Sequence, residues 1–155
     1  MGVKLDEPEL GEFLTSGHTL ILATTRQSGE PFLTPVWYVY ANGAIYFSTP
    51  AKTAKVQHIK RNPRVCCMVE DGERWVDLRA AVLNCDAHFV ADDSAEAQEF
   101  AKLIASKYAA FRPKLKAAPK TTKKHYSGSN ALIKLTFAES EVRSWYNRKI
   151  RGMTD

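Results

Sequence analysis

With 155 residues, 45% of them hydrophobic and 25% charged, the chain has the size and composition of one soluble globular domain with a real core. No apolar run approaches the roughly 20 residues of a membrane-spanning helix, and the polar N-terminus excludes a secretory signal. We therefore expect a cytoplasmic protein with a single domain over residues 1–155.

The net charge of +5 is concentrated in one segment. Between Phe111 and Ser129 there are six basic residues and no acidic one, and without them the rest of the chain would carry −1. Prolines and a glycine interrupt this segment, so we expect a long loop, which is uncommon unless it is functional or mobile. Its basic residues are Arg112, Lys114, Lys116, Lys120, Lys123 and Lys124.

The cysteines and histidines do not predict a metal site. The three cysteines are odd in number and lack a C-x-x-C pair, so neither a disulfide framework nor a zinc site is indicated. Cys66 and Cys67 lie in an apolar strand and are expected to be buried thiols, which favours a reducing compartment. The four histidines are scattered without ligand spacing.

The N-terminal part is predicted to be a helix followed by strands. Asp6 can cap a helix that reaches Ser16, and Thr19–Thr25 reads as a strand. The next strand, Pro31–Tyr40, is apolar or aromatic on both faces. One face is therefore expected to fill a barrel, and the other to meet a second layer, which is a helix, a cofactor or another subunit.

The segment from Ala44 to Asn62 predicts an anion site. Asn42-Gly43 indicates a two-residue hairpin before the strand Ala44–Ser48. We expect Thr49 to cap a helix with Pro50 at its first position and its end near Asn62. Free backbone donors, hydroxyls and ammonium groups then converge at a helix start, where phosphate binds well. The candidate side chains are Ser48, Thr49, Lys52, Thr53 and Lys55.

The C-terminal half adds more short strands and one longer helix. A long strand from Trp75 to Ala91 is expected to bend or break near Asn84, and Asp93 with Glu96 forms a capping-box pattern. The other predicted elements are strands at Arg64–Val69, Asn130–Phe137 and Glu141–Tyr146, and a helix whose apolar stripe is Ala97, Phe100, Ala101, Ile104 and Tyr108. This pattern predicts a mainly β, α+β fold: a barrel of six or seven strands with two or three short helices, although the strand count also fits an OB-fold.

The usual catalytic motifs are absent, so chemistry carried by a bound organic cofactor is the simplest expectation. Arg79 lies within an apolar strand and needs a partner, which is Asp77, Glu73, another acidic residue or a bound anion. Trp37 and Trp145 fit either a core or a binding role.

Four stretches in this order resemble the split β-barrel flavin and deazaflavin oxidoreductases, the superfamily that includes the pyridoxamine phosphate oxidases. The similarity covers Thr19 to Ile150, and the branch it most resembles uses either FMN or the deazaflavin F420. The stretches are LATTRQSGEPFLTPVWYVY, GAIYFSTPAKTAKVQHIKRNPRV, DLRAAVLNCDAHFV and VRSWYNRKI.

The resemblance implies a homodimer with two cofactor sites at its interface, and hydride transfer between the cofactor and a small planar acceptor. It places Thr34, Pro35, Val36 and Trp37 along the tricyclic ring, and the candidate anion residues at the phosphate. Arg79, Trp145 and Lys149 then approach from the partner strand and the C-terminal tail. Ala80 and Tyr146 depart from the glycine and aspartate of the family pattern, which affects the substrate side of the pocket.

Several alternatives stay open at this point. FMN and F420 are near even, and the acid-free basic segment favours F420 because its tail is polyanionic. Tyr38, Tyr146 and ordered water are possible proton donors, and no side chain is assigned as an obligatory acid or base. The protein could also be a non-catalytic flavin or haem carrier on the same barrel, with His88 or His125 as axial ligand, or, least favoured, an OB-like nucleic-acid binder.

Overall fold

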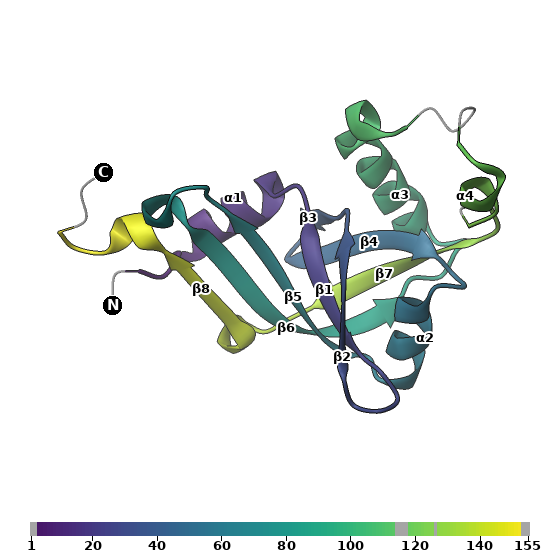
Figure 1. The fold of residues 1–155 in the computed structure, drawn as a ribbon, viewed down its shortest axis with the longest axis horizontal. Coiled ribbons are helices and arrows are strands. Elements are labelled where there is room, and N and C mark those ends of the chain that lie inside the picture. The colour runs from purple at the N-terminus through teal and green to yellow at the C-terminus, as the bar shows by residue number, and fades with distance from the viewer. Residues whose placement is uncertain (1–2, 114–117, 126, 153–155) are drawn as a thin grey trace.

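The computed structural model describes residues 3–113, 118–125 and 127–152 (Figure 1). Its strands form one eight-stranded antiparallel sheet in the order β2-β1-β5-β6-β7-β4-β3, and β8 pairs with β6 outside this path. The strands are β1 (Leu20–Thr25), β2 (Pro31–Val36), β3 (Val39–Ala41), β4 (Ala44–Pro50), β5 (Arg64–Asp71), β6 (Arg79–Phe89), β7 (Asn130–Thr136) and β8 (Val142–Tyr146). The α-helices are α1 (Glu7–Ser16), α2 (Ala54–Arg61), α3 (Ala95–Lys107) and α4 (Lys120–His125).

The sheet curls because its two end strands are nearly consecutive in the chain. β2 and β3 lie at opposite ends of the strand order, yet only Trp37 and Tyr38 separate them. The expected single strand Pro31–Tyr40 is therefore two strands. Buried side chains from β1, β2, β4, β5, β6 and β7 form the main core together with α1 and α2, and partly buried side chains of β3 and β8 pack against it. The predicted mainly β, α+β barrel is confirmed.

Local signals placed several elements correctly. Asp6 caps α1 in a capping box, with its side chain accepting from the Glu9 N–H at 2.9 Å and the Glu9 carboxylate accepting from the Asp6 N–H at 2.8 Å. The hairpin at Asn42 and Gly43 has positive φ at both residues, 53° and 73°. One cap was wrong by a residue: Ser94, and not Asp93, accepts from the Ala97 N–H at the start of α3.

The long strand predicted over Trp75–Ala91 begins later and does change its pairing near Asn84. A short 3-10 helix at Trp75–Asp77 precedes β6. One edge of β6 then pairs with β8 over Arg79–Leu83 and with β7 over Asp86–Phe89. The two pairings meet at Asn84, as expected for a strand that belongs to both halves of a split barrel.

A smaller core lies between α3 and the β3–β4 end of the sheet. Its central side chain is Tyr108, which is fully buried and stacks on Trp37 with ring centroids 4.5 Å apart. The Tyr108 hydroxyl accepts from the Tyr38 N–H at 2.9 Å and donates to the His18 carbonyl at 2.7 Å. Tyr108 therefore fixes the bend between β2 and β3 to α3.

The substitution Tyr108→Phe is expected to lower the free energy of unfolding by about 1–3 kcal/mol, because it leaves the buried Tyr38 N–H without its acceptor. Urea unfolding measures the change. Tyr40→Phe is the matched control, since no hydrogen bond is found for its half-buried hydroxyl in the described structure. Equal costs for the two variants would contradict this role of Tyr108.

One face of the sheet carries apolar side chains that no described helix covers. Alternate residues of β1, β2, β5 and β6 point away from the core and are half-buried or exposed, and Leu33 is 65% exposed. The buried helix side chains belong to the two cores instead. We call this set the outer apolar face: Ile21, Ala23, Leu33, Pro35, Cys66, Met68 and Val82.

The position of Cys66 on this face corrects one expectation. Cys67 points inward and is buried, whereas its neighbour Cys66 is only half-buried because successive strand residues face opposite sides. All three cysteines are free thiols. In the described part of the chain, no helix is long and apolar enough to span a bilayer.

Candidate functional site

The junction between β4 and α2 differs from the prediction in where the helix begins. Thr49 and Pro50 continue β4, because they pair with Ala131 and Asn130 of β7. A short turn follows, and Thr53 occupies the N-cap position before Ala54. The expected cap at Thr49 and first helical residue at Pro50 were therefore wrong, while the helix end at Arg61 with Asn62 as its C-cap was right.

The junction brings two of the predicted anion ligands, Thr49 and Lys55, into contact, and a third, Thr53, is at the N-cap of α2. Lys55 reaches back from the first turn of α2, and its Nζ donates to the Thr49 hydroxyl at 3.2 Å. Thr53 lies between them in the chain, and its Oγ1 is buried without a hydrogen-bond partner. Its side chain does not cap α2, which leaves the first-turn N–H groups without that acceptor. We call Thr49, Thr53 and Lys55 the candidate anion site.

The electrostatics of the candidate anion site favour a negatively charged guest. Lys55 is half-buried, and no carboxylate of the described residues forms an ion pair with it. Burial lowers the pKa of Lys55, and the first turn of α2 contains no acidic residue. A cation at a helix N-terminus is unfavourable unless an anion binds there. The unpaired buried hydroxyl of Thr53 and the unneutralised ammonium group both suit a phosphate.

The other two predicted anion ligands, Ser48 and Lys52, form no hydrogen bond with the candidate anion site among the described residues. Ser48 is exposed on the opposite face of β4 from Thr49, because strand side chains alternate. The Lys52 Nζ donates to the backbone carbonyl of Lys124 at 2.8 Å. This bond joins the β4–α2 turn to α4, in the basic segment expected to be a loop. Lys114 and Lys116 of that segment lie outside the described residues.

The predicted ring-binding stretch Thr34–Trp37 neighbours α2 through the start of β2. Phe32 packs edge-on against His58 of α2, with ring centroids 5.1 Å apart. Thr34 has a buried Oγ1 without a partner, whereas Pro35 is exposed and Val36 is buried. Trp37 instead stacks on Tyr108 of α3. The backbone of this stretch and the Thr34 hydroxyl are the groups that remain for a ligand.

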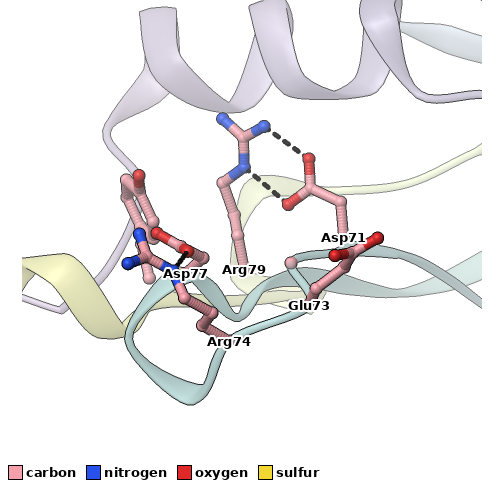
Figure 2. Close-up of a pocket in the computed structure, with 7 residues that line it drawn as sticks. Asp71, Glu73, Arg74, Asp77 and Arg79 are labelled. Atoms are coloured by element: carbon pink, nitrogen blue, oxygen red, sulfur yellow. Dashed lines mark hydrogen bonds and ion pairs between the residues drawn. The ribbon is translucent and has the colours of Figure 1, made fainter. Parts of the chain in front are cut away.

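Arg79 is the first residue of β6 and lines a pocket of about 460 Å³ (Figure 2). Its side chain points from β6 toward α1 and binds Asp71 through two hydrogen bonds of 3.1 and 2.6 Å. The guanidinium also lies 4.3 Å from the Phe13 ring centroid. The sequence left the partner of Arg79 open between Asp77, Glu73, another acidic residue and a bound anion. The partner is Asp71, so the third of these options is correct. Asp77 binds Arg74 and Arg148 instead.

Trp145 and Lys149 do not share one environment. Lys149 forms an ion pair with Glu9 and donates to the Lys4 carbonyl at 2.9 Å, so it holds the C-terminal tail to α1. Trp145 is 37% exposed and faces outward from β8, beside the outer apolar face. Figure 1 shows β8 and α2 toward opposite sides of the chain. One copy therefore does not bring Arg79, Trp145 and Lys149 to the candidate anion site.

Sequence reasoning missed two charged residues at the rim of the outer apolar face. Arg143 lies opposite Val82, and Glu70 lies opposite Ala80. Both are exposed, and the described structure gives neither an ion pair nor a hydrogen bond. Only the alternation of β5 and β8, read together with the sheet order, reveals that they border the same face.

The two tyrosines considered as proton donors lie in other parts of the fold: Tyr38 in the main core and Tyr146 at the pocket beside Arg79. Tyr38 is fully buried, and its hydroxyl donates to the Leu14 carbonyl at 2.6 Å. Burial raises the pKa of Tyr38. Tyr146 lines the pocket beside Arg79. Within the residues that the structure describes, no three His, Cys, Asp or Glu side chains gather to hold a metal.

Comparison with protein families gives one match that covers most of the chain. Residues 6–144 match the family described as pyridoxamine 5'-phosphate oxidase. No curated protein is significantly similar to the sequence.

Solved structures with this fold include proteins of different kinds. The conserved hypothetical protein Rv2991 from Mycobacterium tuberculosis is 27% identical, with a TM-score of 0.79 over 99% of this chain and 92% of that one. HutZ, the haem storage protein from Vibrio cholerae, is 16% identical, with a TM-score of 0.70 over 92% and 97%. An F420 reductase is 20% identical, with a TM-score of 0.62 over 85% and 94%. The last two show the fold alone.

Proposed function

Because the chain belongs to the pyridoxamine 5'-phosphate oxidase family, we propose that it is an oxidoreductase that binds a phosphate-bearing flavin-type cofactor, FMN or the deazaflavin F420. Such a cofactor supplies hydride transfer when bound, here to a small planar acceptor. The candidate anion site is the observation that carries the proposal.

The residues at that site fit the phosphate of either cofactor. Lys55 offers an ammonium group with no carboxylate among the described residues to neutralise it, and Thr53 offers a buried hydroxyl with no other partner. Thr49 orients the Lys55 side chain by accepting from it. The Thr34 hydroxyl and the neighbouring backbone of β2 would then hold the ring, since β2 neighbours α2.

We propose further that the functional unit is a homodimer in which the outer apolar face meets its counterpart. An uncovered apolar face of this kind is typical of an interaction surface. In a two-fold interface the same surface is used by both copies, so Arg143 of one copy can pair with Glu70 of the partner subunit. Of Arg79, Trp145 and Lys149, Trp145 is the one beside that face and is therefore positioned to reach a site in the other copy.

Purification from the native host, followed by a visible spectrum and mass spectrometry of the released ligand, tests the proposal. A flavin or deazaflavin spectrum with about one cofactor per chain supports it, as does saturable titration of the ligand-free protein with either cofactor. A Soret band with no affinity for either cofactor would instead favour the haem alternative, which the likeness to a haem storage protein keeps open. If the protein bound a flavin or deazaflavin but reduced no quinone or enone, the result would favour a non-catalytic carrier.

The choice between FMN and F420 depends on what surrounds the phosphate. The Lys52–Lys124 hydrogen bond brings the basic segment to the candidate anion site, which supports F420 because its tail carries further negative charges. We assign no catalytic acid or base: of the two tyrosines considered, Tyr38 donates its hydroxyl to the Leu14 carbonyl within the core, and Tyr146 lines the pocket beside Arg79.

A further inference from the structure

Lys52 and Lys55 are three residues apart and make different kinds of contact. The Lys55 ammonium group lies inside the candidate anion site against Thr49. The Lys52 ammonium group is exposed and donates to the backbone carbonyl of Lys124, 72 positions away in the chain. The two lysines that looked equivalent in the sequence are therefore distinct in the fold.

The carbonyl that Lys52 contacts lies in the last turn of α4. The Ser127 hydroxyl donates to the same carbonyl at 2.7 Å. The carbonyls at a helix C-terminus carry partial negative charge, so a lysine ammonium group stabilises them. Next to Lys52, the Ala51 N–H donates to the Ser129 carbonyl at 2.9 Å. The β4–α2 turn is thus joined at two successive residues to the segment around α4.

Core packing does not hold α4 in place. None of its six residues is buried, and a helix this short is not stable in water without tertiary contacts. Its side chains include three lysines and no acidic residue. Figure 1 shows α4 on the same side of the molecule as the end of β4 that turns into α2. The Lys52 bond is therefore one of the contacts that join this cationic helix to the β4–α2 turn, next to the candidate anion site.

We propose that Lys52 is a positioning residue: it holds the basic helix α4 against the candidate anion site, so that the site recognises a ligand with negative charges beyond its first phosphate. The proposal rests on the proposed function. Lys55 contacts the first phosphate, whereas Lys120, Lys123 and Lys124 act on the further charges. Lys52 affects the ligand only through α4.

A double-mutant cycle on the full-length protein tests this assignment. The variants are K52M, K55M, the triple change K120S/K123S/K124S, and K52M added to the triple. Binding of FMN, which has a single phosphate, is compared with binding of F420 and of FAD, whose extensions are carboxylates and a second phosphate respectively. We expect K52M and the triple variant each to weaken F420 binding about tenfold at low salt, with no further loss when combined, and to change FMN binding less than twofold. K52R is expected to restore the affinity.

Amide hydrogen exchange gives a readout that needs no cofactor. K52M is expected to accelerate exchange in residues 120–125 about tenfold, whereas K55M is expected to leave it unchanged. Unchanged exchange in K52M, additive losses in the cycle, or FMN weakened as much by K52M as by K55M would each overturn the positioning role. If K55M changed the binding of neither FMN nor F420, the proposed function would be refuted. The exchange result would still decide the role of Lys52. A loss for FAD equal to that for F420 would identify the second charge, and not carboxylates as such, as the feature recognised.

Discussion

Replacing Lys55 by Met is expected to weaken FMN and F420 binding roughly 10- to 100-fold, the effect of removing a charge-assisted hydrogen bond to phosphate. The side chain is half-buried beside Thr49, so the variant also leaves the phosphate next to an apolar group. Fluorescence titration of the ligand-free protein measures the change. Because burial already lowers the pKa of Lys55, the wild-type affinity should fall as the pH rises toward that lowered pKa, and the variant should lack this fall.

Lys60→Met is the matched control on the same helix. Lys60 is exposed near the end of α2, away from its first turn. It removes the same charge from the chain, so a general loss of attraction for anions would weaken binding equally in both variants. Equal affinities for wild type, Lys55→Met and Lys60→Met would show that the phosphate does not bind at the β4–α2 junction.

Replacing Leu33 by Asp is expected to convert the proposed dimer to a monomer at micromolar concentration and to weaken cofactor binding. Leu33 is the most exposed large hydrophobic residue of the described chain and lies on the outer apolar face. A carboxylate buried there without a partner costs several kcal/mol, which corresponds to a rise of at least about 100-fold in the dimer dissociation constant. Sedimentation velocity over a concentration series measures the change.

Leu103→Asp provides the comparison for this prediction. Leu103 is 42% exposed on α3, away from the outer apolar face. The same change of side chain there should leave both association and cofactor binding intact. A wild-type protein that sediments as a monomer, or a Leu33→Asp variant that stays dimeric, would contradict the proposed interface.

The sequence predicted those parts of the fold whose signals are local. The Asn42-Gly43 hairpin and the Asp6 cap of α1 each depend on residues within one turn, and both are present. The start of α2 was misplaced because Thr49 and Pro50 pair with β7, about 80 residues further along the chain. A proline at the end of a strand and a proline at the start of a helix look the same until that partner is known.

The candidate site shows the same limit. The need of Arg79 for a counter-charge followed from its position in an apolar strand, but its partner Asp71 is identified by the pairing of β5 with β6. The different roles of Lys52 and Lys55 could not be predicted, because the carbonyl of Lys124 becomes a neighbour only when β4 and β7 pair. Residues that resemblance grouped together, such as Trp145 and Lys149, separate once their sheet face is known.

The outermost strand β2 limits how another chain can approach. Pro31, Leu33 and Pro35 alternate with the residues that bond to β1, so their backbone nitrogens face the free edge of the sheet. Proline has no N–H, which leaves Leu33 as the one donor among these three positions. A foreign strand cannot add to this edge with a full ladder, so β2 resists runaway sheet extension and amyloid-like stacking. Substituting both prolines with threonine should therefore make the protein prone to forming fibrils while its core stays unchanged.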